Sequence, residues 1–363
     1  MKKLFYAMAM SGLAFAACQN TPGYTIAGTV EGATDGAYVY LQKQSGRDLV
    51  KLDSAVIKGG KFSFEGTQDT AVMRVISYVN GNDKKYLSFF LENGQLNATI
   101  GQETKMTGTP TNEVFNAHNE KRNAAQNELR EMYMKLRTDS TMTEDQKKTL
   151  EAEFEKKSDE MNDANLAFVK ENITNAAGVF MLPMFSYQFE LNELKDLIAK
   201  VPAALNNERI EALKEHVAVV EKTSVGKKFV DFTMNTIDGK QAKLSDFISK
   251  NKYTLVDFWA SWCGPCRGEM PNVVAAYKQF HKKGFGIVGV SLDSKEDQWK
   301  DAVKTLGMEW DQLSDLKGWK SEGAKLYGIN SIPATVLIDQ EGTIVARDLR
   351  GEAIATKLSE LLK

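Results

Sequence analysis

Between residues 24 and 106, apolar and polar residues alternate in short runs. Examples are YTIAGTVEG, GAYVYLQK and AVMRVISYVNG, and glycine or Asn-Gly turns separate such runs. Because successive side chains of a strand point to opposite faces, this alternation predicts strands with one buried face. The spacing of the turns is typical of an antiparallel sandwich or barrel. We therefore expect an antiparallel β-sandwich-like domain over residues 18–108.

A helical period replaces the alternation after residue 110. Residues 115–136 and 150–168 each place mostly apolar positions three and four apart, and the loop TDSTM lies between them. Thr143 and Gln146 have the spacing of a capping box at the start of the second helix. The pattern predicts a long antiparallel helical hairpin within a helical region that spans residues 109–223. Three shorter helices are expected after the hairpin, at about 175–188, 191–200 and 206–222.

Strands and helices alternate from residue 225 onward. The order is strand, helix, strand, helix, then a strand hairpin and a final helix, and it begins with YTLVDFWA, CRGEMPNVVAAYKQFHKK and GFGIVGVSLD. Such an order predicts a mixed sheet with helices on both faces. Together, the three patterns predict a multidomain α/β chain whose last domain covers residues 224–363.

Length and charge narrow the classes of partner. A chain of 363 residues exceeds one typical domain, so two or three domains are expected. The 46 Lys and Arg residues are balanced by 48 Asp and Glu residues, and the lysines are spread along the chain. This balance gives no basic surface of the kind that binds nucleic acid, so no nucleic-acid partner is expected.

The first residues have the pattern of an export signal. Lys2 and Lys3 precede LFYAMAMSGLAFA, an apolar run too short to span a bilayer, and small residues follow it. This pattern predicts that residues 1–17 are a signal peptide and that the chain is exported. The segment AFAAC, which ends at Cys18, resembles a bacterial lipoprotein signal and implies that an acylated Cys18 anchors the protein to a membrane. The alternative is an ordinary signal peptide followed by an incidental cysteine.

The chain has three cysteines, and two of them lie close together in FWASWCGPCRGEMP. If lipid occupies Cys18, only Cys263 and Cys266 remain, and no structural disulfide framework is possible. The pair is therefore expected to serve chemistry. Cys263 should lie where a strand ends and a helix begins, and a helix N-terminus favours the thiolate. We expect the pKa of Cys263 to fall below that of free cysteine.

The residues around the two sulfurs suit thiol exchange. A two-residue spacer places Cys266 within one helical turn, where it can attack a mixed disulfide on Cys263. Pro265 fits the first helical turn, and Gly264 leaves room for a partner chain. Trp262 offers a flat apolar face beside the sulfur.

At this point the sequence resembles a known family. VDFWASWCGPC is similar to the active-site segment of the thioredoxin superfamily, and SIPATVLID to the loop whose cis-proline faces the disulfide. The order of elements and the lipoprotein-like start resemble the TlpA-like thiol:disulfide oxidoreductases of bacterial envelopes. LDSAVIKGGKFSFEG is similar to an uncharacterised β-domain that often precedes such modules. The resemblance implies a thioredoxin-like fold for residues 224–363.

The resemblance also assigns roles to residues. It implies that Cys263 attacks and Cys266 resolves, that Pro333 is cis, and that Ile332 presents its backbone to an extended substrate. Asp257 occupies the place of the buried acid that takes the proton of the resolving thiol. Because apolar neighbours surround Asp257, burial should raise its pKa. The alternative is a strand-end carboxylate that bonds to backbone.

Other patterns point to no cofactor. GFGIVG fits a dinucleotide-binding motif, but its glycines fall in a predicted strand rather than in a turn that opens a helix. Cys263, Cys266 and His281 lack a fourth ligand at zinc-finger spacing, and His118 and His216 have no ligands near them in sequence. We expect no metal, and no cofactor beyond a redox-active Cys263–Cys266 disulfide.

Two classes of function follow. The first is a periplasm-facing, membrane-anchored oxidoreductase that reduces disulfides of envelope proteins and receives electrons from a membrane thiol donor. The second is an envelope binding or scaffold lipoprotein whose thioredoxin-like module is inactive or redox-gated. The intact CGPC pair favours the enzyme. A peroxidase is disfavoured because the peroxidatic Pro/Thr/Cys frame is absent.

Overall fold

The computed structural model describes residues 23–363. The predicted signal peptide and the lipidation site Cys18 lie outside these residues. The chain forms two compact units, one of residues up to Gln188 with Ala199–Asn206, the other of Phe189–Ile198 with Asn207–Lys363. The helical region expected over 109–223 is therefore shared between the two units.

The first unit begins with eight strands, in the region where the alternation predicts antiparallel strands. They form two four-stranded sheets, one in the order β4-β1-β7-β8 and the other in the order β3-β2-β5-β6. Neighbouring strands are antiparallel except β1 and β7, which run parallel. A parallel pair needs a long connection, and the strands from β2 to β6 lie between these two in the chain. The core lies in these sheets, with Ile26, Leu41 and Ile76 fully or almost fully buried. The strands are β1 Tyr24–Val30, β2 Tyr38–Ser45, β3 Asp48–Val56, β4 Lys61–Gly66, β5 Val72–Asn80, β6 Asp83–Leu91, β7 Gly94–Ile100 and β8 Lys105–Thr107.

Strand β3 escaped the sequence prediction. It pairs with β2 over its whole length, yet most of its residues are exposed, including Leu49, Val50 and Leu52. A strand that buries neither face carries no apolar alternation. Its pairing with β2 defines the strand, and no local sequence pattern reveals it.

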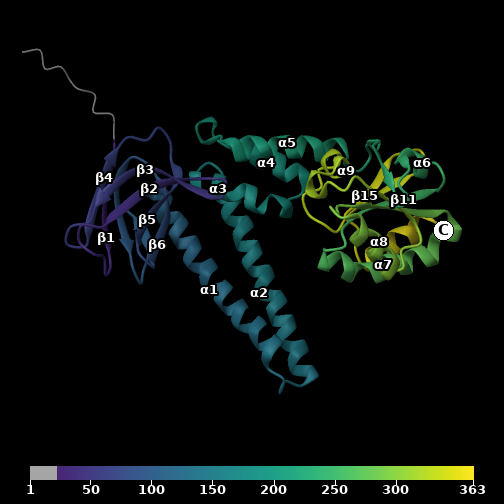
Figure 1. The fold of residues 1–363 in the computed structure, drawn as a ribbon, viewed down its shortest axis with the longest axis horizontal. Coiled ribbons are helices and arrows are strands. Elements are labelled where there is room, and N and C mark those ends of the chain that lie inside the picture. The colour runs from purple at the N-terminus through teal and green to yellow at the C-terminus, as the bar shows by residue number, and fades with distance from the viewer. Residues whose placement is uncertain (1–22) are drawn as a thin grey trace, which may run out of the picture. The chain divides into compact units, whose positions relative to one another are not determined.

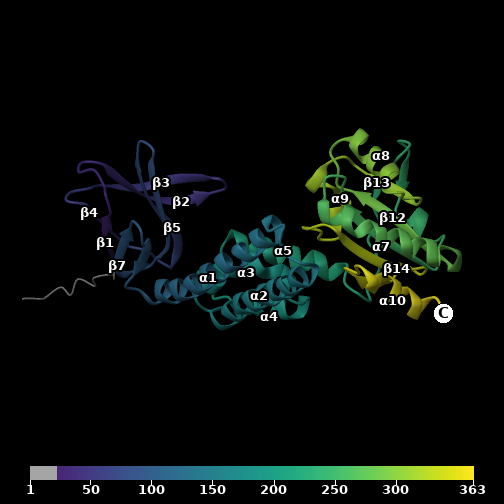
Figure 2. The same cartoon turned by 90° about the horizontal axis from the view of Figure 1, so that it is seen from below.

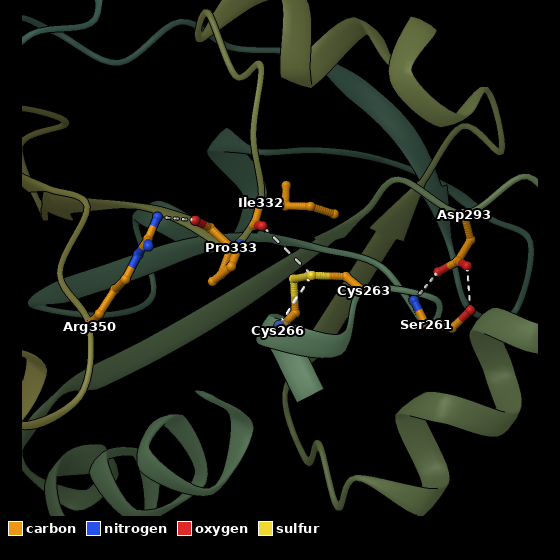
Figure 3. The surroundings of a disulfide bond; sticks show 7 residues. All are labelled: Ser261, Cys263, Cys266, Asp293, Ile332, Pro333 and Arg350. Carbon is orange, nitrogen blue, oxygen red and sulfur yellow. Dashed lines mark hydrogen bonds between the residues drawn. A yellow bond between two sulfur atoms is a disulfide. The ribbon is translucent and has the colours of Figure 1, made fainter. Parts of the chain in front are cut away.

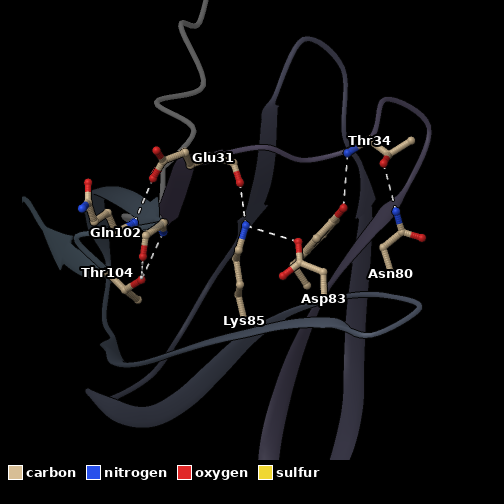
Figure 4. A network of polar contacts seen from close by, with 9 residues as sticks. Glu31, Thr34, Asn80, Asp83, Lys85, Gln102 and Thr104 are labelled. Atoms are coloured by element: carbon tan, nitrogen blue, oxygen red, sulfur yellow. Dashed lines mark hydrogen bonds and ion pairs between the residues drawn. The ribbon is translucent and has the colours of Figure 1, made fainter.

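Polar contacts tie one end of the first sheet to the second (Figure 4). The Lys85 ammonium, on β6, donates to the Glu31 carbonyl at 2.6 Å and pairs with Asp83 at 3.3 Å. The Glu31 carboxylate in turn accepts the backbone N–H of Gln102 at 2.9 Å. Because Glu31 follows β1 and Gln102 follows β7, these contacts connect one end of the first sheet to β6 of the second sheet.

The predicted helical hairpin is present as α1 (Pro110–Thr138) and α2 (Glu144–Glu171), and α3 (Ala176–Phe185) follows it (Figure 1). The capping box is confirmed, because the Thr143 hydroxyl accepts the Gln146 N–H and the Gln146 side chain accepts the Thr143 N–H. The Lys157 ammonium on α2 pairs with Glu128 on α1. The seam between the two helices thus includes charged contacts.

His118 lies between α1 and α2, in the seam of the hairpin. Its ring stacks on Phe168 with centroids 4.1 Å apart, and its Nε2 lies 3.0 Å from the Asn165 side-chain oxygen. The His118 ring therefore takes part in the packing of α1 against α2. Burial, the largest cause, lowers the pKa of His118.

Asn112 joins the hairpin to the β-domain. Its side-chain oxygen accepts the Phe90 N–H at 2.9 Å, and its amide donates to the Phe90 carbonyl at 2.7 Å. Phe90 lies on β6, the last strand of its sheet, so the Asn112 side chain acts as a short extra strand. The Phe90 ring meets Phe115 of α1 edge to face, with centroids 5.1 Å apart. The free N–H and carbonyl groups of Phe90 at the edge of the sheet are thereby paired with a side chain of α1.

The second unit contains a mixed sheet, as the sequence predicts. The sheet has seven strands in the order β10-β9-β13-β12-β11-β14-β15 (Figure 2). Strands β11, β12 and β13 run parallel, and the other pairs are antiparallel. Helices α7 and α8 lie on one face and α6 and α9 on the other (Figure 1). Right-handed crossovers between the parallel strands β11, β12 and β13 place α7 and α8 on the same face. The strands are β9 Thr233–Thr236, β10 Gln241–Lys243, β11 Tyr253–Trp259, β12 Phe285–Ser291, β13 Asp311–Ser314, β14 Ala334–Asp339 and β15 Ile344–Arg347. The helices from α4 onward are α4 Leu191–Lys200, α5 Glu208–Lys222, α6 Ser245–Ile248, α7 Gly264–Phe280, α8 Glu296–Thr305, α9 Glu322–Leu326 and α10 Glu352–Leu361.

Candidate active site

Cys263 lies at the point where the central strand β11 gives way to helix α7. Every residue of β11 after Tyr253 is buried, because the strand is flanked by β12 and β14 and covered on both faces. The chain turns after Trp259, where the Cys263 N–H bonds to the Ala260 carbonyl at 3.1 Å. Cys263 is the N-cap residue of α7, and Pro265 lies in the first turn of the helix. The sequence prediction of a strand-to-helix junction at Cys263 is confirmed.

Cys263 and Cys266 form a disulfide, with their Cα atoms 5.3 Å apart (Figure 3). The Cys263 sulfur also accepts the backbone N–H of Cys266 at 3.1 Å, so an N-terminal amide of α7 points at it. Cys263 keeps an exposed fraction of 5%, against 1% for Cys266. Apart from its chain neighbours and the backbone of its own helix, no described atom lies within 4 Å of where a Cβ on Gly264 would stand, so the space beside the spacer is open. Cys263 is the more exposed of the two cysteines.

A second segment faces the disulfide. The Ile332–Pro333 peptide bond is cis, as the resemblance implied, and the Ile332 carbonyl oxygen lies 3.7 Å from the Cys263 sulfur. The Arg350 guanidinium donates to the Pro333 carbonyl at 2.6 Å and fixes the far side of this loop (Figure 3). Sequence patterns gave no sign of Arg350, because its partner is a backbone atom distant in the chain. The structure thus brings Cys263, Cys266, Ile332 and Pro333 together.

Asp257 is buried in β11, with an exposed fraction of 3%. Burial, and secondly the negative charge of Glu269, raise its pKa to about 7. Within the described chain, its Oδ2 atom has no hydrogen-bond partner. The raised pKa agrees with the sequence expectation, and the unpaired oxygen disfavours the alternative of a carboxylate that bonds to backbone.

The comparisons with known proteins agree with this geometry. A model of the AhpC/TSA family matches residues 225–347. Thiol-disulfide oxidoreductase ResA of Bacillus thuringiensis subsp. konkukian is 32% identical over 143 residues, which cover 39% of this chain and 79% of that protein. ResA of Bacillus subtilis is 30% identical, over 34% of this chain and 67% of that protein. The chain belongs to the thiol-disulfide oxidoreductases of the thioredoxin superfamily.

Two solved structures are similar in sequence to part of this chain. The C-terminal domain of a putative thiol-disulfide oxidoreductase from Bacteroides thetaiotaomicron is 35% identical, with 39% of this chain and 97% of that one covered and a TM-score of 0.37. A thiol-disulfide oxidoreductase from Bacteroides fragilis is 37% identical, with 38% and 100% covered and a TM-score of 0.36. Residues 24–115 of the oxidoreductase match a domain of unknown function, DUF4369.

Asp293 is a residue of the oxidoreductase that sequence reasoning missed. It is 1% exposed, and its carboxylate accepts the Ser261 N–H at 3.0 Å and the Ser261 hydroxyl at 2.5 Å (Figure 3). It also accepts the Ser291 hydroxyl at 2.7 Å. Asp293 therefore holds the turn that leads into Cys263. The only sequence signal for it is an acid just after the end of a buried strand.

The GFGIVG motif and His281, which the sequence analysis considered for cofactor or metal binding, have structural roles. The glycines of GFGIVG lie in and before β12, and a Cβ on Gly286 or Gly289 would meet the side chains of Asn251 or Gln312. The His281 Nδ1 lies 3.2 Å from the Phe285 carbonyl. Between residues 23 and 363, no three His, Cys, Asp or Glu side chains are grouped so that they could hold a metal ion. None of the helices in that range combines the length and apolar character that crossing a bilayer requires.

Proposed function

We propose that this oxidoreductase reduces disulfide bonds of exported proteins with the Cys263–Cys266 dithiol, and that it works outside the cytoplasm on a membrane anchor. The observation that carries the proposal is the position of the Cys263 sulfur, which caps α7, bonds to Cys266 and is the more exposed of the two. A thiolate at a helix N-terminus is stabilised by the amide that points at it. Cys263 is therefore the sulfur that meets the substrate.

The reduced dithiol acts in two exchange steps. The Cys263 thiolate attacks one sulfur of the substrate disulfide, so that a mixed disulfide forms and the other substrate sulfur leaves as a thiolate. Cys266 then attacks the Cys263 sulfur, the enzyme disulfide closes, and the second substrate sulfur leaves. The substrate gains the two electrons and two protons that the enzyme dithiol loses.

Asp257 serves the second step. The Cys266 thiol must lose its proton before it attacks, and Cys266 is almost fully buried. A carboxylate whose pKa is about 7 accepts and returns a proton at neutral pH. The unpaired Oδ2 atom of Asp257 is free for this exchange within the described chain. We assign Asp257 as the group that takes the proton of Cys266.

The Gly-Pro spacer supports the reductive direction, because it resembles that of reducing thioredoxins. Thioredoxin and the strongest oxidant of this fold differ by ~150 mV, which is about 7 kcal/mol for two electrons. Each turnover leaves the enzyme oxidised, so a membrane dithiol protein on the same side must reduce it. Equilibration with glutathione buffers tests the direction. A potential near that of the strong oxidants would overturn it.

The membrane anchor rests on Cys18 and the export pattern before it. Acylation of that cysteine would place the oxidoreductase at a membrane surface beside its electron donor. In cells, the wild-type chain should sediment with membranes, and Cys18→Ser should appear in the soluble extracellular or periplasmic fraction. A Cys18→Ser variant that sediments like the wild type would contradict the anchor.

Insulin reduction tests the activity itself. Wild-type protein supplied with dithiothreitol should accelerate insulin precipitation, and Cys263→Ser should lose that acceleration. In Cys266→Ala, the mixed disulfide should persist, so substrates in cells can be trapped on Cys263 and identified. Equal, near-zero rates for wild type and Cys263→Ser would favour a binding protein over an enzyme.

A further inference from the structure

Two tryptophans lie against each other beside the reactive sulfur. Trp262 directly precedes Cys263, and Trp319 lies in the short 3-10 turn Gly318–Lys320 between β13 and α9. Their ring centroids are 6.0 Å apart, and the ring planes are inclined by 56°. Trp262 is 52% exposed and Trp319 48%. Since two indoles in contact share one apolar surface, we call Trp262 and Trp319 the tryptophan pair.

The loop that carries Trp319 is fixed by its own backbone contacts. The Asp315 carboxylate accepts the Lys317 N–H at 3.2 Å and the Glu322 N–H at 2.9 Å, so it closes the loop from both ends. Leu316 has a φ of 55°, in the left-handed region that non-glycine residues avoid. Such a conformation persists only where the surroundings impose it. The loop therefore has a defined conformation, in which the Trp319 side chain is half exposed.

One segment of the chain supports both members of the tryptophan pair. Asp293 accepts the N–H and hydroxyl of Ser261, next to Trp262. The Ser314 hydroxyl, at the end of β13, donates to the Ser291 carbonyl at 3.0 Å. Ser291 donates its own hydroxyl to Asp293. The end of β12 thus holds both the turn before Trp262 and the end of β13, from which the loop with Trp319 begins.

We propose that the tryptophan pair binds a large apolar side chain that flanks the reacting cysteine of a polypeptide substrate. The inference rests on the proposed function, because the Cys263 sulfur determines that the occupant carries a disulfide. In an extended chain, neighbouring residues lie about 3.4 Å apart along the strand, so a residue one or two positions from the cysteine reaches Trp262. Glutathione disulfide has charged ends and no apolar side chain, so it gains nothing from this surface. The preferred substrates are disulfides in unfolded, apolar segments.

Two model substrates isolate this contact. Each is a short peptide whose single cysteine is joined to 5-thio-2-nitrobenzoate, and the two differ only in Phe or Ser beside the cysteine. The fully reduced full-length protein is mixed with each peptide, and the release of the coloured thiol gives a second-order rate constant. The wild type should react about tenfold faster with the Phe peptide, the scale of one apolar contact. In Trp319→Ala this ratio should fall to about one, and in Trp319→Phe it should remain largely intact.

Controls keep the outcomes separate. Tyr187 is 71% exposed and distant in the sequence, so Tyr187→Ala should keep the wild-type ratio. Urea unfolding of Trp319→Ala should match that of the wild type, which rules out loss of structure as the cause. A wild type without preference, or Trp319→Ala with its preference intact, overturns the inference alone. A wild type that reduces neither peptide nor insulin overturns the proposed function instead.

Discussion

The Glu269 carboxylate accepts the backbone N–H of Gly351 at 2.5 Å, and so connects α7 to the residue that follows Arg350. The same carboxylate is the second cause, after burial, of the raised pKa of Asp257. Glu269 thus has two roles that a single substitution can separate. Glutamine keeps an oxygen that accepts the Gly351 N–H and removes the charge.

In Glu269→Gln, the pKa of Asp257 should fall from about 7 but stay above its ordinary value of 3.8, because burial is the larger cause. Titration of the Asp257 carboxyl carbon by NMR measures this shift. Substitution of the exposed Glu360 by Gln is the control and should leave the titration unchanged. An Asp257 pKa that returns fully to 3.8 would show that charge, not burial, dominates.

Asp257→Asn should change how stability depends on pH. Because the pKa of Asp257 is about 7 in the folded state and 3.8 ordinarily, the folded state holds the proton more tightly. The stability of the wild type should therefore decrease as pH rises from about 4 to about 7, by up to ~4 kcal/mol. Asp257→Asn removes this dependence. Its free energy of unfolding should therefore rise relative to that of the wild type as the pH increases from about 4 to about 7.

Urea unfolding of both proteins between pH 4 and pH 8.5 measures the difference. Exposed Asp48→Asn is the control and should follow the wild type at every pH. Parallel curves for the wild type and Asp257→Asn would contradict the raised pKa.

The two sulfurs should differ in reactivity once reduced. In Cys266→Ser, the Cys263 thiol should be alkylated by iodoacetamide with a midpoint at least about one pH unit below 8.5, because the N-terminus of α7 stabilises its thiolate. In Cys263→Ser, the Cys266 thiol should react far more slowly, since it is only 1% exposed. The rate of alkylation by iodoacetamide, measured as a function of pH for each variant, tests both expectations. A Cys263 that titrates like free cysteine would remove the basis of the proposed mechanism.

Asp293→Ala should destabilise the oxidoreductase by ~3 kcal/mol, because the partly buried donors of Ser261 and the buried hydroxyl of Ser291 lose their acceptor. Asp293→Asn should cost less, since one oxygen still accepts. The alkylation rate of Cys263 should also change in Asp293→Ala, as the turn before it loosens. Exposed Asp301→Ala serves as the control in the same urea titration. Equal unfolding midpoints for all four proteins would refute the role of Asp293.

Asn112→Ala should weaken the first unit by ~3 kcal/mol, because it leaves two buried backbone groups of Phe90 unpaired. Hydrogen exchange of the Phe90 amide measures the effect at its source and should become faster. Asn112→Asp keeps the acceptor and loses the donor, so its exchange should be intermediate. Exposed Asn123→Ala should leave the Phe90 amide protected as in the wild type.

Much of the fold was predictable because local patterns carried it. The capping box at Thr143 and the helical period of the hairpin are local, and both are confirmed. The order of strands and helices after residue 225 predicted the mixed sheet. The strands that were missed, such as β3 and β13, are short or exposed on both faces, so their pairing partners define them and no alternation reveals them.

The site divides in the same way. The sequence by itself determined the sulfurs, their spacing and their place at a strand-to-helix junction, because those depend on neighbouring residues in the chain. Only the tertiary structure decided that Asp293 holds Ser261, that Arg350 holds Pro333 and that Trp319 meets Trp262. Each of those contacts joins segments far apart in the sequence. The local pattern of apolar and polar residues does not indicate which partner each residue has. Hydrogen bonds and ring contacts of this kind exist only once the sheet has brought its strand ends together.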